Sequence, residues 1–233
     1  TLFPSSAPCL RGFDIAGAVH PAERVSGDFL DDFPLGQDSS GVRVADVSGH
    51  GLGPAVLMAL TQAYLRALAE TCANPGELLA RANRLFATSD SGHFVTMFLG
   101  RLDVATCSFD YVAAGHQAYL IAKDGAVRPL RSHSIPLGVE KTMPPCPTST
   151  ITFEAGDILI VPTDGAEEAM SVDGRQFGRK RIFDLVRNNK DEPAVEIVES
   201  LFRAARDFAE GRSQVDDITA VVAKVLPGAP AGC

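Results

Sequence analysis

Four short segments place aspartates beside glycine or beside one another, and these are the residues of the sequence that could do chemistry. In three of them the aspartate lies at the edge of an apolar run that is typical of a β-strand. A rigid scaffold can bring strand ends together from distant parts of a chain, so the carboxylates could form one site. The segments are Gly27–Asp32, Asp46–Gly51, Thr163–Gly165 and Asp216–Thr219.

A site built from several carboxylates would need cations. Two carboxylates about 4 Å apart repel by about 4 kcal/mol at an effective dielectric constant of about 20. Oxygen ligands without thiolates or paired imidazoles favour Mg²⁺ or Mn²⁺ over zinc, and the five histidines show no H-x-x-x-H spacing. Each segment alone is more typical of a tight turn, because Asp and Gly are both common in turns. Four such segments together favour a metal site.

Other catalytic templates fit poorly. The glycine-rich stretch Ser48–Gly53 precedes a helical pattern, but it lacks the Gly-Lys-Ser/Thr of a nucleotide-binding P-loop. The acid that a dinucleotide-binding fold requires downstream cannot be placed. A G-x-S-x-G nucleophile elbow is absent from the sequence. Covalent serine catalysis is therefore not supported.

Composition narrows the class of protein. The 233 residues are 45% hydrophobic and 21% charged, which excludes an intrinsically disordered chain. A formal net charge of −8, with lysines and arginines scattered singly, disfavours nucleic acid and anionic membranes as partners. The longest nearly apolar stretch, Gly53–Leu60, falls short of the roughly 20 residues of a membrane helix. We therefore expect no membrane span.

The cysteines suggest no oxidised framework. They are odd in number, far apart and never in a C-x-x-C pair, which predicts buried or incidental free thiols in a reducing cytoplasm. They are Cys9, Cys72, Cys107, Cys146 and Cys233.

Strands dominate the expected elements, with two pairs of helices between them. Regular βα alternation is absent, so the order favours antiparallel sheets covered by helices, an α+β sandwich in one domain. Asn74 is expected to cap the second helix, and Gly211 to end the fourth in a left-handed conformation. The predicted strands are Phe13–Val19, Val42–Ala45, Phe94–Leu102, Cys107–Ala113, Tyr119–Lys123, Thr150–Phe153, Ile158–Val161 and Ile218–Val225; the helices are Pro54–Glu70, a helix opening at Asn74–Glu77, Arg179–Asn188 and Pro193–Glu210.

The ordered motifs resemble the metal-dependent type 2C (PPM) serine/threonine phosphatases, and most closely their bacterial SpoIIE/RsbU-like branch. The resemblance runs from about Phe13 to Val225 and is specific as a set. It is carried by Gly27–Asp31, Asp46–Gly51, Ala114–His116, Pro136–Gly138, Gly156–Leu159, Thr163–Glu168 and Asp216–Thr219.

The resemblance implies a four-layer αββα sandwich with metals in a cleft at one end. It implies two divalent ions, Mn²⁺ or Mg²⁺, and leaves a third open. Asp46 would bridge the ions, with the Val47 carbonyl on the second; Asp164 and Asp216 would complete the first, and Asp28 would act at or near the second. Asp217 is included among the candidate metal residues, although a supporting role suits it better, as it does Asp31 and Asp32.

Three positions qualify the resemblance. Eukaryotic members carry Asp-Gly-His, whereas here Ser48 stands in the histidine's place and His50 lies four residues after Asp46. His50 is thus a candidate general acid, with a loop-shaping role as the alternative. Ser26 replaces the first glycine of the usual Gly-Gly-Asp, which does not predict inactivity. Arg24 is a candidate phosphate-binding residue, or otherwise a solvated surface arginine.

The expected function is a cytoplasmic phosphoserine/phosphothreonine phosphatase that uses a two-metal-activated water. The resemblance implies a phosphorylated STAS-domain anti-sigma-factor antagonist as substrate, and an N-terminal sensor or receiver domain as regulator. A homodimer is left open. Residues 1–11 would end a linker, residues 12–226 form the phosphatase domain, and residues 227–233 form a flexible tail. The alternative is a degenerate domain that binds a partner without catalysis.

Overall fold

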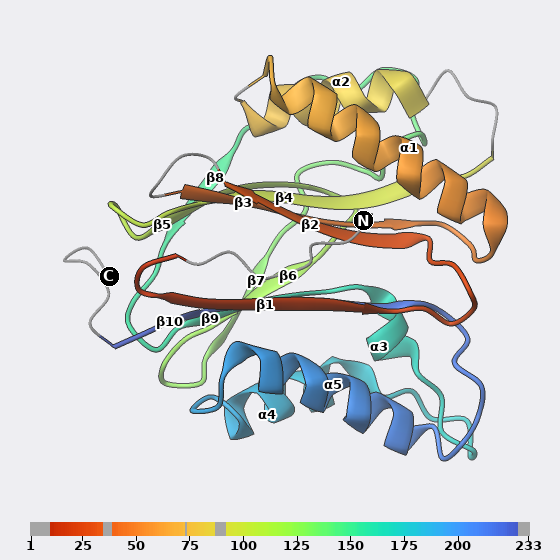
Figure 1. Cartoon of the computed structure of the whole chain (residues 1–233), viewed down its shortest axis with the longest axis vertical. Helices are drawn as coiled ribbons and strands as arrows, with labels where there is room; N and C mark the ends of the chain where they lie inside the picture. Colours follow the sequence, from red (N-terminus) through yellow and green to blue (C-terminus); the bar gives the residue numbers. More distant parts are fainter. Residues whose placement is uncertain (1–9, 35–38, 73, 87–91, 228–233) are drawn as a thin grey trace.

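The fold is a sandwich of two antiparallel five-stranded sheets with helices on both outer faces. The computed structural model describes residues 10–34, 39–72, 74–86 and 92–227. Helices α1 and α2 cover one sheet, while α3, α4 and α5 lie against the other, so the layers run helix, sheet, sheet, helix (Figure 1). This confirms the predicted α+β sandwich.

The first sheet has the strand order β1-β10-β9-β6-β7 and the second has the order β2-β3-β4-β5-β8. The strands are β1 (Phe13–His20), β2 (Asp28–Pro34), β3 (Ser39–Val47), β4 (Val95–Asp103), β5 (Ser108–Ala114), β6 (Ala118–Ile121), β7 (Val127–Leu130), β8 (Ser149–Thr152), β9 (Ile158–Pro162) and β10 (Ile218–Val225). The helices are α1 (Leu52–Ala69), α2 (Pro75–Phe86), α3 (Asp164–Glu168), α4 (Gly178–Asn188) and α5 (Ala194–Phe208).

Each predicted strand and helix overlaps an observed one, but the sequence pattern misses β2, β7 and α3. Strand β2 has three aspartates in seven residues, a composition that predicts a loop. Aspartates are tolerated in this strand because of tertiary contacts, which strand propensity does not describe. Strand β7 contains Pro129 and lies at the edge of its sheet, where proline is tolerated. Helix α3 begins at Asp164-Gly165, a pair that reads as a turn.

Three apolar layers hold the sandwich together. One lies between the sheets, one between the first sheet and α4 and α5, and one between the second sheet and α1 and α2. Successive residues of β2 enter different layers, since Leu30 packs between the sheets and Phe29 packs beneath α1 and α2. The face of β2 that holds Leu30 also holds Asp28, and the face that holds Phe29 also holds Asp31.

Two predicted helix ends are confirmed. The Asn74 side chain accepts a hydrogen bond from the Glu77 amide at 2.9 Å, as an N-cap does. After α5, Glu210 and Gly211 both have positive φ angles, 49° and 85°, so the left-handed ending begins one residue earlier than expected.

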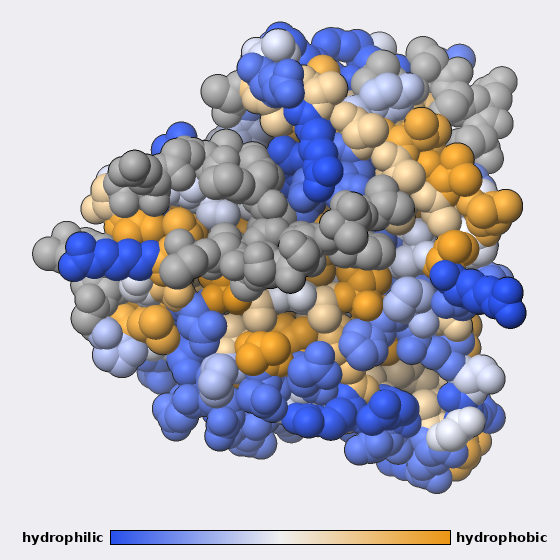
Figure 2. All heavy atoms as spheres, in the orientation of Figure 1, coloured by the Kyte–Doolittle hydropathy of each residue, from blue (hydrophilic) through white to orange (hydrophobic). Residues whose placement is uncertain are grey.

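Helix α1 carries an exposed apolar stripe. Leu52, Val56, Leu60 and Tyr64 are spaced four residues apart and are 73%, 53%, 47% and 40% exposed. They contribute to the apolar surface over α1 at the upper right of Figure 2. Among the described residues, α1 alone has the length and apolar composition of a membrane-crossing helix, which a count of strictly apolar runs had not indicated. Its opposite face packs on β2 and β3 as a core helix does.

The cysteine prediction holds only in part. Cys72 and Cys146 are free thiols. Cys107, which is fully buried, is disulfide-bonded, contrary to the expectation of free thiols throughout. Cys9 and Cys233 lie outside the described residues, as do most of the expected linker and tail.

Candidate metal centre

The four aspartate segments meet at one end of the sandwich, at the right of Figure 1. Strand β2 begins where β3 ends, and the antiparallel register pairs Asp28 with Asp46. In the other sheet, β9 ends at Pro162 opposite Ala220 of β10. Asp164 therefore follows one strand at the same edge where Asp216 precedes its neighbour. Antiparallel pairing, rather than closeness in sequence, assembles the carboxylates.

Gly165 allows Asp164 to approach Asp216. A Cβ atom at Gly165 would stand 2.0 Å from the carbonyl oxygen of Asp217, so only glycine fits there. The residue lies in helix α3 and has no positive φ angle. The Asp-Gly pair thus serves close packing against the start of β10, and the turn interpretation of this segment is wrong.

Asp28 is buried, with 2% of its surface exposed, and lies between the two sheets. Its Oδ2 accepts a hydrogen bond from the Thr163 hydroxyl at 2.8 Å, and the Thr163 hydroxyl in turn accepts one from the Thr219 amide at 3.0 Å. Burial and the nearby Asp46 carboxylate raise the pKa of Asp28 well above its usual value. These bonds hold the carboxylate in place but do not neutralise its charge.

Asp46 lies at the centre of the cluster. Burial, followed by the charges of Asp164 and Asp216, raises the pKa of Asp46 to about 7. Burial raises the pKa of Asp164 and of Asp216 as well. Glu168, at the end of α3, is another acid whose pKa rises by burial and through the charges of Asp164 and Asp216. Asp28 is buried, Asp46 and Asp216 are half-buried and Asp164 is exposed, so the cluster is a group of partly desolvated carboxylates in which the charges of Asp164 and Asp216 raise the pKa of Asp46.

In the part of the chain that the structure describes, no ion pair offsets this charge, although His50 lies near enough to lower the pKa of Asp216. Within the described ranges, none of the ion pairs involves Asp28, Asp46, Asp164 or Asp216. No three His, Cys, Asp or Glu side chains of those ranges are gathered tightly enough to enclose an ion by themselves. That openness suits Mg²⁺, which keeps several waters and binds through one or two carboxylates. The donor set fits hard divalent ions and leaves room for water.

The Val47 carbonyl oxygen is available to bind an ion, because Val47 and Gly27 share one hydrogen bond in place of the usual reciprocal pair. The Val47 amide donates to the Gly27 carbonyl at 3.3 Å, but the Gly27 amide donates to Asp217 Oδ2 at 2.7 Å instead of returning the bond to Val47. A Cβ at Gly27 would stand 3.1 Å from the Val47 oxygen. The end of the β2–β3 ladder is thus open at a carbonyl oxygen beside Asp46.

Asp217 has a different setting from the other aspartates. It is 4% exposed, and its two oxygens accept hydrogen bonds from the Ala22 amide, the Ser26 hydroxyl and the Gly27 amide at 2.7, 2.8 and 2.7 Å. The Ser26 hydroxyl also accepts a bond from the Asp28 amide. Asp217 therefore fastens the loop before β2 to the start of β10, and Ser26 is used in that contact.

His50 and Arg24, the candidate residues for proton transfer and phosphate binding, are both exposed. His50 Nδ1 is 2.7 Å from the Glu23 carboxylate, and the imidazole is near enough to influence Asp216. Arg24 is exposed, and the described part of the chain shows no hydrogen bond or ion pair from it. His50 is thus placed beside the carboxylates, whereas nothing draws Arg24 to them.

Asp31 belongs to a separate site on the opposite face of β2. It pairs with Arg43 of β3 at 3.2 Å and with Arg66 of α1 at 3.0 Å. Asp32 occupies β2 opposite Val42, and its side chain lies outside the described part of the structure.

Thr163, Thr219 and His116 stand in motifs that carry the family resemblance, but sequence reasoning gave none of them a role at the site. Buried His116 contacts the Thr96 hydroxyl through Nδ1 at 2.9 Å, and its Nε2 has no hydrogen-bond partner of normal geometry among the described residues. Burial lowers the pKa of His116 to about 4, so the imidazole is neutral beside Asp46 and Asp164 in the same cavity.

A comparison with protein families decides the family. The model described as Stage II sporulation protein E (SpoIIE) matches residues 36–226. The chain belongs to the SpoIIE family. The match includes Asp46, Asp164 and Asp216, while Asp28 lies before it.

Curated relatives and solved structures agree with this SpoIIE assignment. Protein IcfG of Synechocystis is 29% identical, over 94% of this chain and 39% of its own length. Phosphoserine phosphatase RsbU of Bacillus subtilis is 26% identical, over 95% and 66%. The chain therefore spans less than two thirds of these relatives. The PP2C domain of SiaA from Pseudomonas aeruginosa has a similar fold, with a TM-score of 0.79 at 21% identity over 89% of this chain and 84% of that one.

A structure of RsbX in complex with magnesium also has this fold, with a TM-score of 0.65, 18% identity and coverage of 91% and 96%. Like the SiaA domain, it is too distant in sequence to show more than the fold. The SpoIIE-family chain thus has the sandwich of PP2C phosphatase domains, with its carboxylates gathered at one end.

Proposed function

We propose that this domain is a metal-dependent phosphatase that hydrolyses phosphoserine and phosphothreonine in proteins. The observation that carries the proposal is the convergence of Asp28, Asp46, Asp164 and Asp216, whose pKa values burial raises and which form no ion pair within the described residues. Carboxylates in this arrangement destabilise the fold unless they bind cations. The names of RsbU and RsbP, both phosphoserine phosphatases, support the same reaction.

Asp46, Asp164, Asp216 and Asp28 would hold two divalent ions, Mn²⁺ or Mg²⁺, together with the Val47 carbonyl. When bound, such ions supply Lewis-acid activation of a water and neutralise the charge of the phosphate dianion. Without them the carboxylates would repel a phosphate. The site therefore couples metal binding to substrate binding.

Other residues of the chain keep these groups in place. Thr163 orients Asp28 by donating to its Oδ2, in a position where the Asp28 carboxyl is near enough to interact with Asp46. Asp217 is a positioning residue in this proposal, because its oxygens already accept three hydrogen bonds from the loop before β2. Its bonds fix the backbone that carries Asp28.

His50 is the proposed proton donor for the leaving serine alkoxide. The Glu23 carboxylate, 2.7 Å away, orients the ring through Nδ1. The imidazole lies beside Asp216, at the edge where a leaving group could depart. A role in shaping the loop remains the competing interpretation, and substrates with different leaving groups separate the two.

The same site argues against a domain that only binds a partner. A protein-binding scaffold gains nothing from four carboxylates that raise one another's pKa values, because that repulsion costs stability. A catalytic site that binds metal explains their presence.

Regulation and partners form part of the proposal. We infer a phosphorylated STAS-domain protein as substrate in the cytoplasm, and control by an N-terminal sensor or receiver domain. The exposed stripe Leu52, Val56, Leu60 and Tyr64 on α1 supports such control, since an apolar surface of this kind marks a contact site. Because α1 begins five residues after Val47, a partner on this stripe could alter the metal site. The stripe also provides a surface for a homodimer.

The test is hydrolysis of p-nitrophenyl phosphate and of a phosphoserine peptide with Mn²⁺ and with a chelator. Asp46→Asn and Asp216→Asn should each lower kcat/KM with Mn²⁺ by more than the roughly 10- to 100-fold that loss of an outer partner of a metal ligand costs. The matched control is Asp191→Asn, an exposed aspartate in the turn between α4 and α5, which should retain activity. Hydrolysis that persists in chelator, or in both site variants, would refute the proposal.

A further inference from the structure

A cavity of about 640 Å³ adjoins the metal centre on its α5 side. It is enclosed by α5, the end of α3 and the segment that leads from α5 to β10, at the lower right of Figure 1. Asp216 and Gly165 form part of its wall. Whatever occupies this cavity is therefore directly beside a phosphoryl group held at the carboxylates.

The floor of the cavity is apolar and rigid. Phe202 and Ile218 are each 5% exposed there, and Ala205 is 1% exposed. The Phe202 ring stacks on His20 of β1 with 3.9 Å between ring centroids. A volume of this size accommodates one or two side chains, and pockets of about 300–1,000 Å³ are typical of ligand sites.

Acidic and basic side chains line different parts of the cavity. Glu168 and Asp216 lie at the metal end, Glu199 lies on α5, and three arginines, Arg203, Arg206 and Arg212, line the rest. Arg203 is 3.6 Å from Glu196, outside the cavity, and Arg212 donates to the Val172 carbonyl. Arg206 is exposed and makes no hydrogen bond or ion pair within the described residues.

We propose that this cavity binds the part of the protein substrate that flanks the phosphorylated residue, with an apolar side chain on Phe202 and a carboxylate paired with Arg206. The inference rests on the proposed phosphatase function and adds a preference for an acidic and apolar flank. Continuity with Asp216 puts the flank next to the phosphate. The Arg206 guanidinium supplies the charge complementarity, in a protein whose formal net charge is −8.

Two phosphoserine peptides test the preference. One carries leucine and aspartate within four positions on each side of the phosphoserine, and its twin carries lysine in place of aspartate. The wild-type protein with Mn²⁺ should favour the acidic peptide in kcat/KM, mainly through a lower KM. Arg206→Glu should lower kcat/KM for the acidic peptide about fivefold and favour the lysine peptide. Hydrolysis of p-nitrophenyl phosphate should stay within about twofold, because this substrate has no flank.

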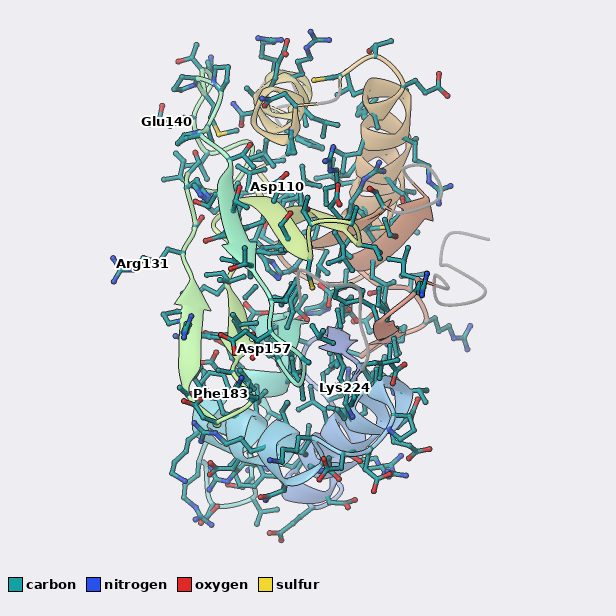
Figure 3. All side chains as sticks on the ribbon, turned by 90° about the vertical axis from the view of Figure 1, so that its left-hand side faces the viewer. Asp110, Arg131, Glu140, Asp157, Phe183 and Lys224 are labelled. Carbon is teal, nitrogen blue, oxygen red and sulfur yellow. The ribbon has the colours of Figure 1, made fainter. Side chains whose placement is uncertain are left out.

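Two further variants separate the pocket from general effects. Ala209→Trp, at the end of α5, should obstruct the cavity and raise KM for both peptides while sparing p-nitrophenyl phosphate. Arg131→Glu is the matched control, since Arg131 is exposed, follows β7 at the opposite edge of the first sheet from β1, and points into solvent (Figure 3). It should keep the wild-type preference for the acidic peptide.

The outcomes are distinguishable. If Arg206→Glu and Ala209→Trp hydrolyse both peptides as the wild type does, the pocket inference is wrong and the phosphatase function stands. If the wild-type protein with Mn²⁺ hydrolyses neither the peptides nor p-nitrophenyl phosphate, the proposed function fails and the inference fails with it.

Discussion

Two aspartates of β2, three residues apart, show how differently this fold treats buried charge. Asp31 faces α1 and is neutralised by Arg43 and Arg66. Asp28 faces the other sheet, where its nearest charged neighbours are Asp46 and Asp217. Both side chains are almost completely buried, 3% and 2% exposed. The chain thus provides its own counter-ions for a structural carboxylate and withholds them from the carboxylates of the site.

The far end of the sandwich repeats the structural pattern. Asp157, labelled in Figure 3, is 5% exposed. Its oxygens accept hydrogen bonds from the Lys123 and Glu154 amides at 3.0 and 2.9 Å. Hydrogen bonds or ion pairs from the protein itself are therefore the rule for a buried aspartate here, and Asp217 follows this rule at the metal end. Asp28 departs from it, because its main charged neighbour is a second carboxylate, Asp46. That departure is the physical sign of a site that binds something else.

The largest expected effect comes from breaking the neutralised pair. Asp31→Ala leaves the Arg43 guanidinium, 3% exposed, without its carboxylate, and loss of one partner of a buried pair costs about 3–5 kcal/mol. Burial already lowers the pKa of Arg43 to about 10, which shows how poorly that position solvates a charge. The free energy of unfolding, measured by urea denaturation, should fall by this amount with or without Mn²⁺.

Arg66→Ala is the matched control, because it removes the exposed partner of the same aspartate. The Arg66 side chain is 54% exposed, and exposed ion pairs contribute about 0–1 kcal/mol. Equal destabilisation by the two variants would show that burial does not decide the energetics of this network.

The second prediction concerns the unneutralised cluster and its pH dependence. Because burial and neighbouring carboxylates raise the pKa of Asp46 to about 7, the folded metal-free protein binds this proton more tightly than the unfolded chain does. The resulting stability is fully present below about pH 4, the pKa of an unfolded aspartate, and is lost as the pH rises through about 7. The metal-free melting temperature should therefore fall between pH 5.5 and pH 8.

Mn²⁺ should reverse this loss by replacing the protons, so the Mn²⁺-induced rise in melting temperature should be larger at pH 8 than at pH 5.5. Asp46→Asn should stabilise the metal-free protein at pH 8 by about 1–2 kcal/mol, the opposite sign to Asp31→Ala, and should reduce the Mn²⁺ response. A Mn²⁺ response independent of pH, and equal in the variant, would mean that Asp46 does not bind the ion.

The contrast between the two kinds of aspartate also marks what the sequence could predict. Asp46, Asp164 and Asp216 adjoin strands that apolar patterning identifies, so the convergence of these residues could be anticipated. Asp28 begins a strand whose aspartates make it look like a loop in the sequence. Asp31 is tolerated in β2 because it pairs with Arg43 and Arg66, and Arg66 is 35 residues from Asp31 in the sequence. A local pattern contains no information about such a partner.

The supporting residues were hidden for a related reason. Thr163, Thr219 and Ser26 are ordinary polar residues whose roles depend on contacts between residues 56 to 191 positions apart. The sequence shows a glycine at position 165, but it does not tell why glycine is needed there. A turn and a close approach to a neighbouring strand both favour glycine, and only the Asp217 oxygen 2.0 Å from its would-be Cβ distinguishes them.

The smallest expected effect tests His50 at the exposed edge of the cluster. If His50 donates a proton to the leaving group, His50→Gln should lower kcat for a phosphoserine peptide about fivefold. This loss is smaller than is usual for a general acid. The reason is that the His50 side chain is 62% exposed, so water can donate the proton instead. p-Nitrophenolate leaves without a proton, so kcat for p-nitrophenyl phosphate should not change. Glu23→Gln, which removes the carboxylate beside His50 Nδ1, should produce a weaker effect with the same substrate dependence. Equal effects on both substrates would assign His50 to the shape of the loop, because a displaced loop would disturb the neighbouring Asp46 whichever group is leaving.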